Sequence, residues 1–210
     1  MRPKQGTPQG GVISPLLANL YLHWFDKVFL REKKHSEARL IRYADDFVIM
    51  TRRYQDEVGT YVREKIETWL GLKINEEKTK VVDLKRGEEL TFLGYTFVFR
   101  KDLKGRDKKY LNMTPSKKAV QKEKDRIKEI TDTKQCFKPL TRVIEELNRN
   151  LRGWGNYFRL GYPRQAMRDI NYFIHERLKR HAKRRSQRRY TLRDGRSYYE
   201  QFRKMGLKTL

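Results

Sequence analysis

The sequence predicts an α+β protein in which antiparallel β-hairpins with helices are followed by an all-helical region. Up to about residue 113, short runs rich in β-branched and aromatic residues alternate with turn residues and helical patterns. After Thr114-Pro115, apolar residues recur at helical spacing and little strand signal is left. We therefore expect two domains, residues 1–113 and residues 114–210.

The first domain opens with a loop, because its first fifteen residues are rich in Gly, Pro, Thr and Gln. Ser14-Pro15 is typical of an N-cap followed by proline at the first helical position, and it predicts a helix over about 15–33. Next, "RLIRYADDFVIMT" (39–51) predicts a β-hairpin with Asp45 and Asp46 at its turn.

A second helix is expected over about 58–70, with Gly71 as its stop. Shorter extended segments follow at 72–84 and 90–99, and 108–114 is expected to pair back across the charged loop that precedes it. In the second domain the apolar spacing predicts three helices, over 116–131, 139–151 and 163–182.

Charge is the strongest feature of the composition, with a formal net charge of +24. Residues 1–100 contribute about +4 and residues 101–210 about +20, and basic faces of this kind most often meet phosphate backbones. A membrane partner is disfavoured, because no apolar run approaches the ~20 residues that span a bilayer. The single cysteine, Cys136, excludes an internal disulfide and a Cys-rich zinc module. Without a signal-peptide pattern at Met1, we expect a reducing cytosolic location, the bacterial cytosol or an organelle matrix.

The adjacent Asp45 and Asp46 point to metal chemistry. Neighbouring carboxylates repel each other and are costly to desolvate, whereas a hard cation such as Mg²⁺ turns the pair into a binding site. Two-metal phosphoryl transfer uses such carboxylates. An exposed Asp-Asp turn is the plain alternative, and for the bare dipeptide it is the commoner case. The two apolar strands that flank Tyr43-Ala44-Asp45-Asp46 favour the metal site.

Five segments resemble the reverse transcriptases of group II introns (maturases), in the family's order and over nearly the whole chain. "RYADDFVIM" resembles the catalytic hairpin of reverse transcriptases, and "GTPQGGVISPLLANLYLHWFD" resembles the segment before it. "LGLKINEEKTKVVD" and "FLGYTF" are similar to the next block and to the primer-grip region. "LNRNLRGWGNYFR" resembles the signature of the maturase-specific (X or thumb) domain. The resemblance implies a partial polymerase palm followed by an all-α thumb/maturase domain.

The resemblance also implies roles for individual residues. Asp45 and Asp46 are implied as catalytic metal ligands for Mg²⁺, with Tyr43 supporting the nucleotide or primer end. A role at the incoming deoxynucleotide is implied for three loop residues, Gln9, Gly10 and Gly11, although an ordinary loop before the helix is the alternative. Lys78 matches a lysine that helps the leaving pyrophosphate, or it is simply a solvated lysine.

Gly94 and Tyr95 align with the block that positions the primer, and Gly94 would let a nucleic-acid backbone approach closely. Trp154, Tyr157 and Phe158 stand at i, i+3 and i+4, which favours core packing over base stacking. RNA contact is expected instead from basic residues around and after them: Arg152, Arg159, Arg180, Lys183, Arg184, Arg185, Arg188 and Arg189. The histidines show no metal-ligand spacing with other acids.

The expected function is that of a C-terminal portion of an intron-encoded RNA-directed DNA polymerase and maturase. It would bind intron RNA and a template-primer duplex, and a DNA target, for splicing and retrohoming. The family's fingers and an upstream metal-binding aspartate precede the first block of this chain, and Asp26, at the far end of a predicted helix, does not replace that aspartate. We expect the chain to polymerise only with a partner chain that supplies these parts. The alternative is an inactive, RNA-binding splicing cofactor.

Overall fold

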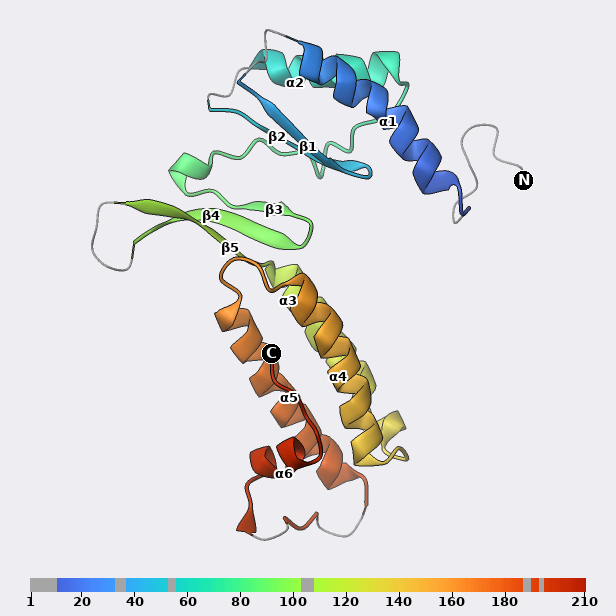
Figure 1. Ribbon diagram of the computed structural model, residues 1–210, viewed down its shortest axis with the longest axis vertical. Helices are drawn as coiled ribbons and strands as arrows, with labels where there is room; N and C mark the ends of the chain where they lie inside the picture. The colour runs from blue at the N-terminus through green and yellow to red at the C-terminus, as the bar shows by residue number, and fades with distance from the viewer. Residues whose placement is uncertain (1–10, 33–36, 53–55, 103–107, 187–189, 193–194) are drawn as a thin grey trace. The chain divides into compact units, whose positions relative to one another are not determined.

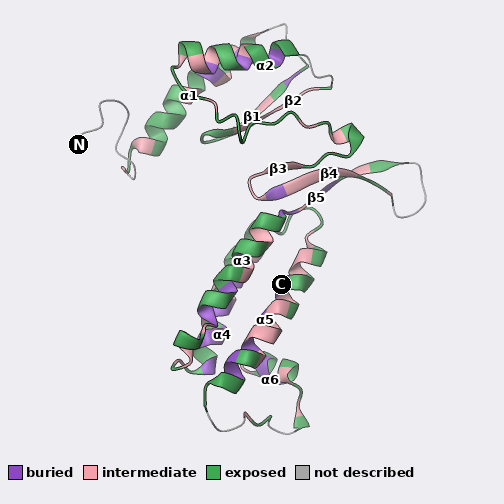
Figure 2. Ribbon diagram, turned by 180° about the vertical axis from the view of Figure 1, so that it is seen from behind, coloured by how far each residue is buried: buried purple, intermediate pink, exposed green. Residues whose placement is uncertain are grey.

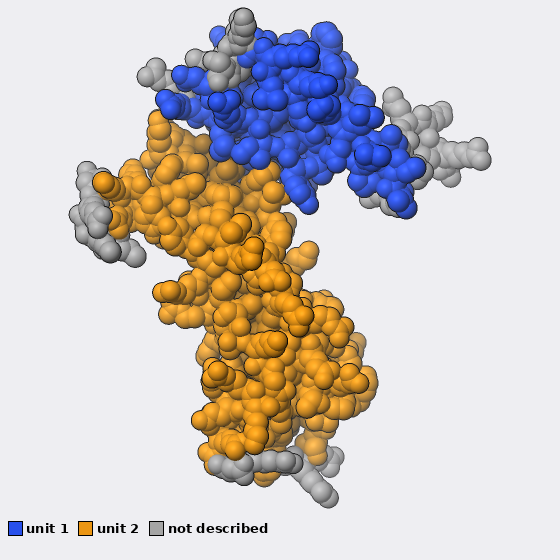
Figure 3. Space-filling view, viewed as in Figure 1, with its two compact units in different colours: residues 1–81 blue, residues 82–210 orange. Residues whose placement is uncertain are grey.

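The computed structural model describes residues 11–32, 37–52, 56–102, 108–186, 190–192 and 195–210. The chain forms two compact units, Met1–Val81 (unit 1) and Val82–Leu210 (unit 2) (Figure 3). In the described parts the α+β class is confirmed: antiparallel hairpins and helices come first, and helices alone follow the last strand. No described helix is long and apolar enough to cross a membrane.

Unit 1 combines helices with one β-hairpin (Figure 1). Its elements are α1 (Ser14–Arg31), β1 (Arg39–Tyr43), β2 (Asp46–Met50), α2 (Asp56–Arg63) and the π-helix η2 (Glu64–Trp69). The predicted hairpin is confirmed, with antiparallel register from Arg39↔Met50 to Tyr43↔Asp46. The helix predicted over 58–70 is present as α2 and η2, and Gly71 after it adopts φ 62°, as expected of a stop.

The core of unit 1 gathers where α1 meets α2, η2 and the hairpin. Its buried residues are Phe25, Phe29, Ala38, Val58, Val62 and Ile66. The start of α1 differs by one residue from the prediction: Ser14 is already helical, and Ile13 is the N-cap without a side-chain cap. Pro15 remains in the first turn, where its missing N–H costs no intrahelical hydrogen bond.

The first half of α1 exposes an apolar face, drawn mostly green in Figure 2. Exposed large apolar residues along and just before it are Val12, Ile13, Leu16, Leu17, Leu20, Tyr21 and Trp24. From Gly11 to Phe25 the sequence has no Lys, Arg, Asp or Glu. This face is therefore both apolar and uncharged.

Unit 2 begins with a three-stranded antiparallel sheet of order β3-β4-β5. A 3₁₀ turn, η3 (Leu84–Arg86), precedes β3 (Leu90–Phe92), β4 (Tyr95–Lys101) and β5 (Lys109–Pro115). The predicted pairing of 108–114 is confirmed by the β4–β5 register. The prediction of an extended segment at 72–84 is wrong, because a turn at 76–78 and η3 occupy it and no described strand lies beside it.

Four helices complete unit 2: α3 (Lys117–Ile130), α4 (Leu140–Tyr157), α5 (Arg164–Arg184) and α6 (Tyr198–Lys204), with the 3₁₀ turn η4 (Thr133–Gln135) after α3. The first three correspond to the predicted helices, and α4 continues six residues beyond its predicted end. Their apolar stripes form one core, visible as the buried faces in Figure 2. Fully buried members include Ile127, Val143, Ile144, Leu147, Ile170, Ile174, Leu178 and Phe202.

The compact units divide after Val81, whereas the sequence predicts a domain boundary at about 114. The β3–β5 sheet belongs to unit 2 because it packs on the helices: Tyr95 contacts the rings of Tyr157 and Phe158. The boundary at 114 concerns the division into functional domains, and it stays a prediction.

Candidate functional site

The turn between β1 and β2 holds the acidic pair. Tyr43 pairs with Asp46, so Ala44 and Asp45 are the two central residues of a tight hairpin turn. Ala44 adopts φ 54° while Asp45 does not have a positive φ, which is the sign pattern of a type II′ turn. Glycine normally fills that position, and a residue with a Cβ costs about 1–2 kcal/mol there. Strain of this kind clusters at functional sites.

Asp45 and Asp46 are both exposed, and Tyr43 beside them is 66% exposed. Their oxygens are hard donors, and Mg²⁺ is commonly held by one or two carboxylates together with substrate phosphates. The donor set therefore fits a magnesium ion shared with a ligand. Across the described ranges no group of three or more His, Cys, Asp or Glu is placed to hold a metal without such a ligand.

Arg42 fixes this turn to α1, a role that the sequence did not suggest. Its Nε and Nη2 donate to the carboxylate of Asp26, at 2.9 Å to Oδ1 and 2.5 Å to Oδ2. Its Nη1 donates to Asn19 Oδ1 at 2.9 Å and to the carbonyl of Ala44 at 2.8 Å. Hydrogen bonding to Asp26 raises the pKa of Arg42 against the opposing effect of burial. Asp26 is thus engaged by Arg42, and the guanidinium holds the turn's backbone.

The other residues predicted around the nucleotide are only partly described. Gln9 and Gly10 lie outside the described residues. Gly11 accepts a hydrogen bond from the N–H of Ser14 at 3.1 Å, just before α1. Lys78 is exposed in a turn, where its N–H donates to Asn75. The roles of these residues at the nucleotide stay predictions.

The turn between β3 and β4 is a second tight hairpin. Phe92 pairs with Tyr95, and both central residues have positive φ, Leu93 at 48° and Gly94 at 78°, the pattern of a type I′ turn. Tyr157 stabilises it by donating from its hydroxyl to the Leu93 carbonyl at 2.9 Å. A Cβ on Gly94 would lie 3.2 Å from the Phe158 ring. The missing side chain at 94 thus serves internal packing, and the approach of a primer there stays a prediction.

Helix α4 and the loop after it bring the aromatic residues of the maturase-like signature onto the sheet. Phe158 is buried between Trp154 and Tyr95, with ring centroids 4.7 and 5.0 Å apart. Tyr95 donates from its hydroxyl to the Tyr157 carbonyl at 2.5 Å. Trp154 and Phe158 have the packing role that their spacing favoured. Tyr157 keeps about half of its surface exposed beside the sheet.

The predicted RNA-contacting residues are exposed where they are described. Arg152 lies on α4, Arg159 follows it, and Arg180, Lys183 and Arg184 lie on α5. Arg185 caps α5 and donates from Nε to the Cys136 carbonyl at 3.4 Å. Arg188 and Arg189 lie outside the described residues. The described members offer cationic groups to solvent from α4, α5 and the α4–α5 loop.

The two histidines of unit 2 lie against other side chains and the backbone. His181 is buried, desolvation lowers its pKa, and its Nδ1 lies 3.4 Å from the Thr131 carbonyl. His175 packs on the rings of Tyr199 and Phe202. Both histidines contribute to packing in unit 2.

Comparison with known proteins adds family matches to this geometry. Residues 2–97 match the reverse transcriptase (RNA-dependent DNA polymerase) family, and residues 120–199 match the group II intron maturase-specific domain. Protein YkfC of Escherichia coli (strain K12) is 28% identical in an alignment that covers 55% of this chain and 38% of that protein. Group II intron-encoded protein LtrA of Lactococcus lactis subsp. cremoris is 68% identical over 28 residues, 13% of this chain and 5% of LtrA. The matched part thus spans well under two thirds of either relative.

Proposed function

The chain belongs to the group II intron reverse transcriptase/maturase family, and from this premise we propose that it is the C-terminal portion of an intron-encoded RNA-directed DNA polymerase and maturase. Its own activity is binding of structured intron RNA through unit 2. Splicing and retrohoming, with a template-primer duplex and a DNA target, are activities of the complete polypeptide to which it contributes. We place it in the bacterial cytosol or an organelle matrix.

The distribution of charge carries this proposal. Unit 2 has 35 Lys and Arg against 15 Asp and Glu, a net +20, whereas unit 1 has 15 against 11, a net +4. The excess thus accompanies the maturase-specific match at 120–199. Phosphate neutralisation with release of counterions supplies most of the affinity of such surfaces for nucleic acid. Structured RNA is read mainly through its shape and backbone.

The acidic turn is the proposed catalytic element. The reverse transcriptase family is generally dependent on divalent metals. A magnesium ion at Asp45 and Asp46 would stabilise charge on the attacking and leaving oxygens of nucleotidyl transfer. In this arrangement Asp45 and Asp46 supply the carboxylates, Arg42 holds the turn, and Tyr43 supports the primer end or nucleotide. Lys78 meets the leaving pyrophosphate.

In this proposal a loop and a hairpin turn contact the nucleotide and the primer. Gln9, Gly10 and Gly11 contact the incoming deoxynucleotide, and Gly94 and Tyr95 position the primer. Two metal ions need more hard ligands than Asp45 and Asp46 provide, so in this proposal polymerisation also requires the fingers and another aspartate. A second candidate function, an RNA-binding splicing cofactor without polymerisation, is supported by the same excess of charge in unit 2.

The test is RNA binding by the full chain. It is measured by fluorescence anisotropy with a labelled RNA hairpin between about 50 and about 200 mM KCl. We expect a steep salt dependence, with a log-log slope of about −0.7 to −0.9 per phosphate neutralised. Replacing Lys183, Arg184 and Arg185 by Gln should weaken binding far more than Asp45→Ala does. A flat salt response refutes the proposal, and the reverse order of the variants moves the RNA site to the hairpin.

Primer extension on an RNA template with Mg²⁺ completes this test and separates the two candidates. Extension that appears only when a fingers-bearing chain is added, and is lost in Asp45→Ala, identifies the polymerase. Its absence in the complemented mixture, with RNA binding intact, identifies the splicing cofactor.

A further inference from the structure

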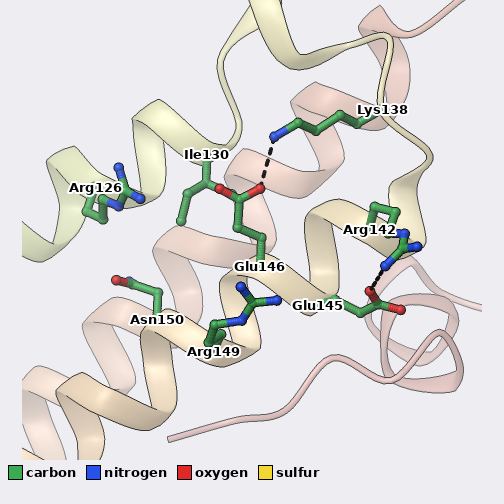
Figure 4. A pocket seen from close by; sticks show the side chains of 8 residues that line it. All are labelled: Arg126, Ile130, Lys138, Arg142, Glu145, Glu146, Arg149 and Asn150. Carbon is green, nitrogen blue, oxygen red and sulfur yellow. Dashed lines mark hydrogen bonds and ion pairs between the residues drawn. The ribbon is translucent and has the colours of Figure 1, made fainter.

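A pocket in unit 2 lies between the C-terminal half of α3, Lys138 and the part of α4 up to Asn150 (Figure 4). Its volume is about 500 Å³, and it opens to solvent. The lining residues are Arg126, Ile130, Lys138, Arg142, Glu145, Glu146, Arg149 and Asn150. Four of these eight side chains are cationic and two are anionic, so the pocket attracts anions.

The floor of this pocket is fixed by packing between the two helices. Asn150 donates from Nδ2 to Glu123 Oε1 at 2.5 Å, and Glu123 is only 6% exposed. Ile130 belongs to the helical core. Because a part-buried hydrogen bond and a core residue hold α3 and α4 together, we expect the pocket to keep its shape without a ligand.

Three of the four cations form ion pairs. Lys138 Nζ lies 3.0 Å from Glu146, and Arg142 Nη1 lies 3.1 Å from Glu145. Arg126 Nη1 lies 2.7 Å from Glu129, outside the pocket. Their side chains are between 31% and 73% exposed, and such ion pairs are worth only about 0–1 kcal/mol. A stronger anion can therefore replace the carboxylates at little cost.

Arg149 is the exception among these cations. Its side chain forms no ion pair or hydrogen bond with any residue that the structure describes. Figure 4 shows its guanidinium group beside Glu146 at the pocket. A guanidinium offers five N–H donors in a planar fork that matches two oxygens of a phosphate. Arg149 thus has N–H donors available for an anion, close to the other cationic side chains of the pocket.

We propose that this pocket binds a backbone phosphate of RNA, with Arg149 as the bidentate donor and Arg126, Lys138 and Arg142 neutralising its charge. The inference deepens the proposed function and rests on it. None of the eight lining residues is aromatic, so the pocket has no aromatic ring on which a base could stack. The excess of cationic side chains favours recognition of the phosphate over recognition of the base. Arg152 follows Arg149 by three residues on α4, and it continues the same face toward the other expected RNA contacts.

The first experiment compares Arg149→Gln with the matched control Arg203→Gln in the full chain. Arg203 is exposed on α6, and its side chain likewise has no ion pair or hydrogen bond within the described ranges. With a fluorescein-labelled RNA hairpin, Arg149→Gln should weaken binding and reduce the steepness of the log-log salt slope by about 0.7 to 0.9, the contribution of one phosphate. Arg203→Gln should leave the slope unchanged. Equal slopes for both variants and the original chain refute the site.

The second experiment follows the backbone amide of Ile130 and the side-chain amide of Asn150 by NMR. We expect both signals to shift in proportion to added RNA hairpin, and inorganic phosphate at equal concentration to leave them in place. Shifts that saturate with inorganic phosphate alone overturn RNA as the ligand. If these signals do not shift while those of the α5 arginines do, the pocket is not an RNA site, and the proposed function still stands. If the chain binds no RNA at all, the proposed function is refuted.

Discussion

Arg42 is the residue on which the geometry of the acidic turn depends. It joins Asp26 and Asn19 of α1 to the carbonyl of Ala44, so one side chain connects the helix to the turn. The side chain is 11% exposed and that of Asp26 is 21% exposed, which protects the pair from screening by solvent. Hydrogen bonds to charged groups in such surroundings contribute about 1.5–3 kcal/mol each.

We expect Arg42→Gln to lower the stability of the hairpin by about 2 kcal/mol, because the shortened neutral side chain leaves Asp26 without its counter-ion. Hydrogen exchange at the amides of Ile41 and Val48 measures this, since the exchange of both should accelerate. Arg39→Gln in the same strand is the control, and surface changes of this kind stay within about 0.5 kcal/mol. If both variants exchange alike, Arg42 does not hold the turn.

For single residues, the sequence predicted which side chains lie at the turn better than it predicted the residues that they contact. The hairpin register follows from alternation and turn residues, so Asp45 and Asp46 could be placed at the turn. Arg42 could not be assigned, because its partners lie 16 and 23 residues away and strand periodicity does not reveal a contact with a helix. An arginine between apolar strand residues, two positions before a turn, is the only local signal of such a role.

Helices α3 and α4 are joined by a buried acid whose charge is poorly compensated. Burial raises the pKa of Glu123 from 4.5 to about 7, although the hydrogen bond from Asn150 and the charge of Arg126 act in the opposite direction. In the unfolded chain Glu123 ionises near pH 4.5, while in the fold it keeps its proton up to about pH 7. Its contribution to stability is therefore full below pH 4.5, and it is lost as the pH rises toward 7.

We expect Glu123→Gln to stabilise the protein at pH 8 by up to about 3 kcal/mol, because glutamine keeps an acceptor for Asn150 and has no charge to desolvate. Below about pH 4.5 the two proteins should be equally stable. Urea unfolding at about pH 4 and about pH 8 compares the stabilities of the two proteins. Glu129→Gln, exposed on the same helix, should show no such pH dependence, and a constant difference between Glu123→Gln and the original chain would contradict the assignment.

Among elements, the helices of unit 2 were predictable because their apolar residues repeat with the helical period. The end of α4 was not, because the Gly-Trp-Gly segment interrupts this pattern while packing on the sheet keeps it helical. The sequence also did not predict why residue 161 is glycine. Gly161 has φ 75°, and a Cβ there would lie 2.3 Å from the Met113 carbonyl, so the α4–α5 loop closes directly on β5.

At the scale of the molecule, the compact units and the expected functional domains divide the chain at different places. The sheet β3–β5 carries sequence that matches reverse transcriptases at least to residue 97, yet it packs with the maturase-specific helices. Composition changes near residue 114 and was visible in the sequence. The packing of Tyr95 on Phe158 was not, because it joins residues more than sixty positions apart.

We therefore expect a fragment of residues 82–210 to unfold at a clearly higher temperature than a fragment of residues 114–210. The shorter fragment loses the acceptor of the Tyr157 hydroxyl and the ring of Tyr95 against Phe158. Together these contacts contribute about 3 kcal/mol, which corresponds to more than about 10 °C for a domain of this size. Far-ultraviolet circular dichroism follows the unfolding of the helices in both fragments. Equal melting temperatures would mean that the sheet adds nothing to the helical core.

The bare apolar face at the start of α1 has a practical consequence for handling the protein. At low ionic strength the net charge of +24 keeps molecules apart, so that these uncharged faces rarely meet. Concentrated salt, which strips nucleic acid from a basic surface, shortens the reach of that repulsion to about 3 Å at 1 M. The buffer that frees the chain of RNA during purification is thus the one in which it will self-associate, and a mild detergent or a low protein concentration is needed at that step.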